Sequence, residues 1–471
     1  MRSLLQKFTT FTSSLLPSET SYLLSIQRFE DKERLQILRR VHYNAEHADQ
    51  FTPYDTSINK RKYNHLQNWI ADKLKAVDVD EQFNEMLSWE QKIMNDSIQP
   101  EEEKKILKTI RNYRHPIFFF SKFYELVEHY RHFLLLRLRY TDHQLADTFV
   151  KTHRAAYLQA RQTKEQLHEA ALDIVAHYSS KHADSRQWQG WLAEIFYNEH
   201  LEGQIRYQAL VQLTFICHNY RNYDILRSKF DYLDQQFAKG LYYSKRLLVN
   251  YYSNRLMLHS NFREYDKALY YGYLSIRAKT HDFLFYVNNL CAVLLRLKRH
   301  QEALQLLQNT SAEAKKTKNF HNRIGFVAFY MEALIKNGLS KNAVNYGTSF
   351  LKAYHKEVLQ FRWHLFFSVY LEALFSQKQF ECLLRAAKKY RLQERDKSYR
   401  QAASYLPTIP IYIKGAQLRE GIISEKQFAE AIQKTLSTTN KGQQKQTKMQ
   451  PFLNSLQHYL PELQGQITFV N

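Results

Sequence analysis

The sequence predicts an all-α protein in which antiparallel helix hairpins stack into an α-solenoid, preceded by an N-terminal helical region. Glycine and proline are scarce, with 11 and 8 among 471 residues, and turn-rich β architectures need more of both. Leucine, glutamine, lysine, glutamate and alanine are abundant, as in mostly helical chains. From about residue 205 a short pattern also returns with a nearly constant spacing, which is typical of two-helix repeats.

Residues 1–100 are predicted to form the N-terminal helical region. Pro17 and Ser18 stand before an apolar-periodic run, which is a signal of a helix start. After a turn at 53–55, apolar side chains recur along one face of a second predicted helix. These side chains are Tyr63, Leu66, Ile70 and Leu74.

Residues 101–204 are predicted to form long helices that lead into the repeats. Three glutamates, at 101–103, follow Pro100, and carboxylates stabilise the positive N-terminal end of a helix. Two long segments with helical periodicity come next, FFFSKFYELVEHYRHFLLLRLR and HQLADTFVKTHRAAYLQARQTKEQLHEAALDIVAHY. We expect both segments to be helical.

Residues 205–437 contain the repeats. Five segments align, each with a polar turn and then a small or apolar anchor residue. Before each anchor lies an apolar-periodic helix, and the first helices FYMEALI (329–335) and VYLEALF (369–375) match each other in register with the anchors. The anchors are Leu226, Ala268, Ala303, Ala343 and Leu383. Their nearly even spacing along the chain predicts one helix hairpin for each copy.

Two of these segments, NNLCAVLLRLKRHQEALQLL and REYDKALYYG, resemble the tetratricopeptide repeat. That family has a small residue where its second helix crosses its neighbours, as at Ala268, Ala303 and Ala343. An aromatic residue commonly stands three positions earlier, as Tyr265 does, and His300 takes that place in the next copy. The resemblance covers about 205–437 and implies a right-handed solenoid. The whole chain also resembles uncharacterised bacterial helical-repeat proteins of similar size.

The end of the chain is predicted to close the solenoid. One last hairpin ends near residue 437, and a polar linker follows at 438–449. Residues 450–471 then contain a short capping helix and a tail. Such a helix would cover the apolar face that the last repeat otherwise exposes.

Composition and motifs exclude several classes of protein. The three cysteines are widely spaced and form no CxxC, which favours a reducing compartment over a disulfide framework. No apolar run is long enough to cross a membrane, so we expect a soluble cytoplasmic protein. The common motifs for nucleotide, phosphate, zinc or nucleophilic-serine chemistry are absent. We therefore expect no enzymatic activity, no cofactor and no metal site.

The repeat itself predicts a binding face. First helices of a tetratricopeptide solenoid line its concave side, and that family often places asparagine there to hold an extended peptide backbone. Asn254 and Asn289 stand at the same distance before their anchors. In two later copies Phe329 and Val369 take that place, but three positions further on Glu332 and Glu372 repeat on a neighbouring part of the face. The sequence therefore predicts a non-catalytic scaffold or adaptor that binds a peptide or protein with a basic end. Alternatively, the asparagines bridge helices and the glutamates face water.

A second hypothesis rests on the net charge of +21 and on the densest cationic segment, 385–400. Clustered cations neutralise phosphates, and the interleaved Tyr390 and Tyr399 suggest stacking on bases. The alternative function is thus a nucleic-acid-associated or peptide-sensing regulatory protein. A solvated hairpin turn is the simpler interpretation. The candidate contacts are Arg385, Lys388, Lys389, Arg391 and Arg395.

Overall fold

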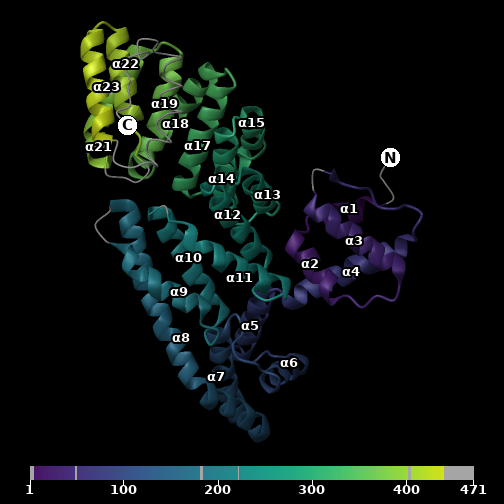
Figure 1. The fold of residues 1–471 in the computed structure, drawn as a ribbon. Helices are drawn as coiled ribbons and strands as arrows, with labels where there is room; N and C mark the ends of the chain where they lie inside the picture. Colours follow the sequence, from purple (N-terminus) through teal and green to yellow (C-terminus); the bar gives the residue numbers. More distant parts are fainter. Residues whose placement is uncertain (1–4, 48–49, 181–183, 221, 401–404, 440–471) are drawn as a thin grey trace. The chain divides into compact units, whose positions relative to one another are not determined.

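The computed structural model describes residues 5–47, 50–180, 184–220, 222–400 and 405–439 (Figure 1). Within these residues every regular element is a helix and no strand occurs, so the all-α prediction is confirmed. The chain forms two compact units, Met1–Phe262 and Arg263–Asn471. Beyond Thr439, the predicted linker and the predicted capping helix at 450–471 lie outside the described residues.

The N-terminal region of the first unit consists of short and medium helices with well-defined starts. The helices are α1 (Gln6–Ser13), α2 (Pro17–Ile26), α3 (Lys32–Glu46), α4 (Lys60–Val77), α5 (Val79–Met94) and α6 (Pro100–Arg111). The side chains of Asp31, Asn59 and Asp78 accept hydrogen bonds from the backbone N–H groups that open α3, α4 and α5, which stabilises a helix start. The predicted start at Pro17 is confirmed, as is the buried face of α4.

The rest of the first unit contains the predicted long helices. The helices are α7 (Phe120–Leu136), α8 (Tyr140–Ser180), α9 (Gln189–Tyr197), α10 (Gly203–Tyr220), α11 (Arg227–Ala238) and α12 (Lys245–Asn261). Helix α8 is 41 residues long and packs along α7, where the Tyr124 and Tyr157 rings stack with centroids 4.2 Å apart. Two 3₁₀ turns, Ser185–Trp188 and Asp224–Leu226, precede α9 and α11.

The second unit continues with helices that follow one another through short turns. The helices are α13 (Tyr265–Ser275), α14 (Phe283–Arg296), α15 (His300–Asn309), α16 (Ser311–Lys316), α17 (Phe320–Lys336), α18 (Ser340–Gln360), α19 (Trp363–Ser376), α20 (Phe380–Lys389), α21 (Leu392–Tyr399), α22 (Thr408–Arg419) and α23 (Glu425–Thr439). The repeat pattern does not predict the short helices α16 and α21, which occupy the longer connections.

The anchor residues of the repeat are buried, as predicted. Ala268, Ala303 and Ala343 have no exposed surface, and Leu226 and Leu383 are buried as well. Gly347 stands one helical turn after Ala343. A Cβ atom at Gly347 would come within 2.5 Å of the Met331 sulfur on α17 and 2.7 Å of a Tyr370 ring carbon on α19. Small residues therefore allow α18 to approach both neighbouring first helices closely.

One turn geometry recurs between paired helices. The turn residues of the second unit, Lys298, Gly338, Lys378 and Gly421, have φ values of 60°, 77°, 55° and 67°. In each turn the following N–H donates to the carbonyl five residues earlier, which is the bond of a Schellman helix end. The same bond forms after Asp96 and Leu138, where Ser97 donates to Lys92 and Arg139 donates to Leu134. The hairpins of α5 with α6 and of α7 with α8 thus share this turn, although the sequence revealed the repeat only after residue 205.

We expect Ala303→Phe to destabilise the protein by roughly 1–3 kcal/mol, because a large side chain at a fully buried helix contact overpacks it. Ala312→Phe, on the exposed side of α16, is the matched control and should change stability much less. Urea denaturation followed by circular dichroism measures both variants. Equal stability of the two would show that Ala303 does not stand at a tight crossing.

Candidate functional site

The predicted acidic pair lies on two adjacent first helices. Glu332 belongs to α17 and Glu372 to α19, and these two helices pack against each other. Lys336 stands one turn after Glu332, and its Nζ lies 2.9 Å from Oε1 of Glu372. The Glu372 side chain is 13% exposed and that of Lys336 is 28% exposed. Two carboxylates and one ammonium therefore form an acidic cluster of Glu332, Lys336 and Glu372.

Within the described residues, Glu332 makes no hydrogen bond and no ion pair, unlike Glu372. The pKa of Glu332 is raised to about 7, first by burial and then by the nearby Glu372 carboxylate, while Lys336 acts in the opposite direction. Burial also raises the pKa of the Cys291 thiol on α14, and Glu332 adds to that shift. The pKa of His300 is lowered by burial and then by Lys336.

A carboxylate with these properties is suited to an external cation. Removing a carboxylate from water without a partner is unfavourable, and a nearby like charge makes it more so. A lysine or arginine side chain placed beside Glu332 would supply the missing countercharge. The sequence pattern predicted the glutamates, but it did not indicate that Lys336 would pair with Glu372.

The predicted asparagines belong to different units. Asn254, on α12, is partly buried, and its Nδ2 donates to Oδ1 of Asn250 at 3.2 Å. The same Asn250 oxygen accepts from the Tyr207 hydroxyl at 2.8 Å. Asn254 thus bonds within its own helix, and it is Asn250 that links this helix to α10. A carboxamide has two donors and one acceptor oxygen, so this single bond does not use its full capacity.

Asn289 lies on α14 and is partly buried. Its neighbour Asn288 is buried, and the Asn288 Nδ2 donates to the carbonyl of Asn322 at 2.9 Å near the start of α17. A Cβ atom at Gly325 would come within 3.2 Å of that nitrogen. Sequence reasoning missed Asn288, whose role is structural. The signal in the sequence that could have identified Asn288 is an asparagine pair inside an otherwise apolar helix.

The basic segment occupies α20, α21 and the turn between them. Lys388 and Lys389 are exposed, whereas Arg395 is partly buried. Arg385 donates to the sulfur of Cys382 at 3.2 Å, and the exposed Arg391 pairs with Glu394 at 3.0 Å. The structure therefore leaves the two lysines as exposed cations, while two of the arginines already have partners.

The tyrosines of this segment pack inside the protein. Tyr390 contacts the Phe367 ring at 5.3 Å between centroids, and Tyr399 stacks on the ring of His364 at 4.8 Å. Asp396, in the same segment, is buried and accepts a 2.9 Å hydrogen bond from the Tyr405 hydroxyl. These contacts weaken the hypothesis that the two tyrosines stack on bases.

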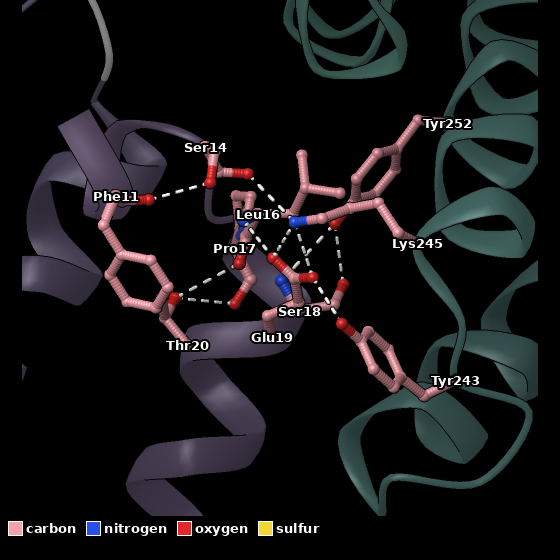
Figure 2. A network of polar contacts seen from close by, with 10 residues as sticks. All are labelled: Phe11, Ser14, Leu16, Pro17, Ser18, Glu19, Thr20, Tyr243, Lys245 and Tyr252. Carbon is pink, nitrogen blue, oxygen red and sulfur yellow. Dashed lines mark hydrogen bonds and ion pairs between the residues drawn. The ribbon is translucent and has the colours of Figure 1, made fainter. Parts of the chain in front are cut away.

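Figure 2 shows a polar network that sequence reasoning also missed. The Glu19 side chain is fully buried and accepts from the Leu16 N–H at 2.6 Å, the Tyr243 hydroxyl at 2.6 Å and Nζ of Lys245 at 2.7 Å. The Ser18 hydroxyl lies 2.8 Å from that of Tyr252. These bonds join α2 to residues far later in the sequence of the same unit, so the network is structural. The related signal in the sequence was the helix-start pattern at Pro17, which indicated the start of α2 but not its distant partners.

The described residues contain no group of three or more His, Cys, Asp and Glu side chains placed to hold a metal ion. None of the described helices has the length and apolar character needed to cross a membrane. The chain matches no protein-family model, and no curated protein or solved structure matches it either.

We expect Glu332→Gln to stabilise the protein at pH 8 by about 1–3 kcal/mol and to have little effect at pH 4. The pKa of this carboxyl is raised from 4.5 to about 7, so the unfolded chain ionises first. Stability is therefore lost as the pH rises between these two values. Urea denaturation at several pH values measures the difference from the wild type.

The exposed Glu394, changed to Gln, is the control. The stability difference between this control variant and the wild type should not increase comparably with pH. If the difference between Glu332→Gln and the wild type stayed constant from pH 4 to pH 8, Glu332 would not be the carboxylate that burial penalises.

Proposed function

We propose that this protein is a non-catalytic, cytoplasmic scaffold or adaptor that binds an extended peptide or a protein segment carrying a basic residue. In this proposal the hairpins stack as a tetratricopeptide-like solenoid, and the first helices line its concave face. The observation that carries the proposal is the acidic cluster, in which the partly buried Glu332 makes no hydrogen bond or ion pair within the described residues.

The chemistry of the cluster selects a cationic guest. Lys336 is held against Glu372 at 2.9 Å, so an incoming cation would contact Glu332 without first displacing that pair. An arginine guanidinium can donate two parallel hydrogen bonds to one carboxylate. Binding would shift Glu332 toward its ionised form, and the cost of burying that charge would fall.

The asparagines would act on peptide backbone, each within its own unit. An extended segment leaves its N–H and C=O groups unpaired, and a carboxamide can satisfy one of each. Asn254 and Asn289 would then each contribute affinity that depends little on side chains. Specificity would come from Glu332 and Glu372.

A display library of random peptides tests this function without a known partner. The wild-type chain should enrich peptides rich in lysine and arginine, and binding of a selected peptide should be stronger at pH 8 than at pH 5.5. The double variant Glu332→Gln with Glu372→Gln should weaken a selected peptide by roughly 1–3 kcal/mol for each charged hydrogen bond that it removes. Truncating Asn254 and Asn289 to alanine should weaken it by about 1–3 kcal/mol with folding nearly intact.

Glu394→Gln is again the control, and it should bind like the wild type. Enrichment of acidic or purely apolar peptides would contradict the proposal. So would full binding by the double glutamine variant. If the asparagine variant lost stability while its folded fraction bound normally, the asparagines would be structural.

The alternative function predicts nucleic-acid binding at the basic segment. Because Tyr390 and Tyr399 contact other rings and two arginines are already partnered, we expect retention on nucleic acid no stronger than that of an equally basic control protein. Changing Lys388, Lys389 and Arg395 to glutamate should then leave the salt dependence of retention unchanged apart from the general loss of charge. A selective loss in this variant would favour the alternative function.

A further inference from the structure

Five large apolar residues that belong to the turn between α7 and α8 or to the neighbouring helix ends are exposed, and Figure 1 shows this turn at one end of the α7 and α8 pair. We call them the tip patch. The ion pair between Arg137 and Asp96, with Nη2 and Oδ1 2.6 Å apart, brings this turn beside the turn between α5 and α6. The tip patch consists of Met94, Leu135, Leu136, Leu138 and Tyr140, with exposed fractions of 66%, 43%, 67%, 68% and 64%.

The backbone gives independent support that an apolar residue at this turn is unusual. Leu138 has φ of 59°, a conformation that favours glycine and disfavours larger residues. The turn needs this left-handed conformation, but it does not need a leucine, so an exposed leucine here is unfavourable both for the backbone and for solvation. Among the described residues, those that share both this positive φ and the printed turn hydrogen bond with Leu138 are Asp96, Gly240, Lys298, Gly338, Lys378 and Gly421, which are polar or glycine. Tyr242 also has a positive φ, of 60°, but its side chain is buried.

The charges around the tip patch neutralise one another. Arg137 pairs with Asp96, and Arg139 contacts both Glu103 and Asp142. Nearby, Lys92 pairs with Glu102 and Lys104 with Glu101. In these contacts four basic side chains meet five carboxylates, whereas the whole chain has a net charge of +21. The tip patch is thus a place where two copies of a strongly basic chain can meet with little repulsion.

We propose that the tip patch is the interface through which two copies of this chain form a dimer. Each copy exposes about 500 Å² of apolar side chain here if each residue contributes about 100 Å², so a symmetric contact would bury about 1,000 Å², near the lower limit of a specific interface. Contact with a copy of itself is the commonest symmetry of soluble oligomers. The neutral surroundings disfavour nucleic acid and an anionic membrane as the occupant.

Sedimentation equilibrium of the full chain tests the proposal at concentrations from about 1 to 100 μM, in the range where small interfaces associate. The wild type should form a dimer, and added salt should not dissociate it, because the contact is apolar. The double variant Leu136→Gln with Leu138→Gln keeps the charge and should raise the dissociation constant at least about tenfold. The matched control changes Leu158 and Leu172 to Gln, which are 53% and 58% exposed on α8, and should dimerise like the wild type.

A second variant separates association from folding. Leu138→Gly relieves the backbone conformation and removes one apolar side chain, so it should raise the thermal midpoint while weakening the dimer. A wild type that stays monomeric at the highest concentration overturns the proposal, as does a double variant that dimerises normally. A monomeric wild type that binds uncharged phosphatidylcholine vesicles, with binding lost in the double variant, would assign the tip patch to a lipid surface instead and would also contradict the proposal.

Discussion

The hairpin turn is the constraint on which the rest of the second unit depends. Each first helix ends where one residue adopts a left-handed conformation, and the next N–H bonds back to the carbonyl five residues earlier. This closes the helix and reverses the chain in a fixed number of residues. Because the turn residues Lys298, Gly338 and Lys378 are evenly spaced along the chain, equivalent side chains of successive helices are placed in equivalent positions.

Close packing then holds the helices that the turns connect at short distances from one another. The alanine anchors that follow these turns are fully buried, and Gly347 leaves no space for a Cβ atom against Met331 and Tyr370. With the second helix held so close, the polar positions of the first helices on the opposite side remain partly exposed. Glu332 and Glu372 occupy such positions, so their proximity follows from the period of the chain and from the pairing of α17 with α19.

The period and the helical pattern were therefore sufficient to predict the all-helical structure and the buried anchors, although not the short helices α16 and α21. They were insufficient wherever a partner lies far away in sequence. Nothing near Pro17 indicates that Glu19 bonds to Tyr243 and Lys245, and nothing near Asp396 indicates its burial against Tyr405. The turns before residue 205 also escaped detection, since Asp96 and Leu138 share a backbone conformation but no side-chain pattern with the later turns.

Two carboxylates, Glu19 and Glu332, differ in how the fold compensates their charge. Glu19 is fully buried, yet three donors surround it within 2.7 Å, so its charge is compensated inside the fold and removing it would leave those donors unpaired. Glu332 is partly buried, but in the described part of the chain the nearby ammonium of Lys336 pairs with Glu372. A fold gains no stability from a carboxylate held in this way. This difference between the two carboxylates is the physical basis of the proposal that Glu332 receives its countercharge from a bound partner.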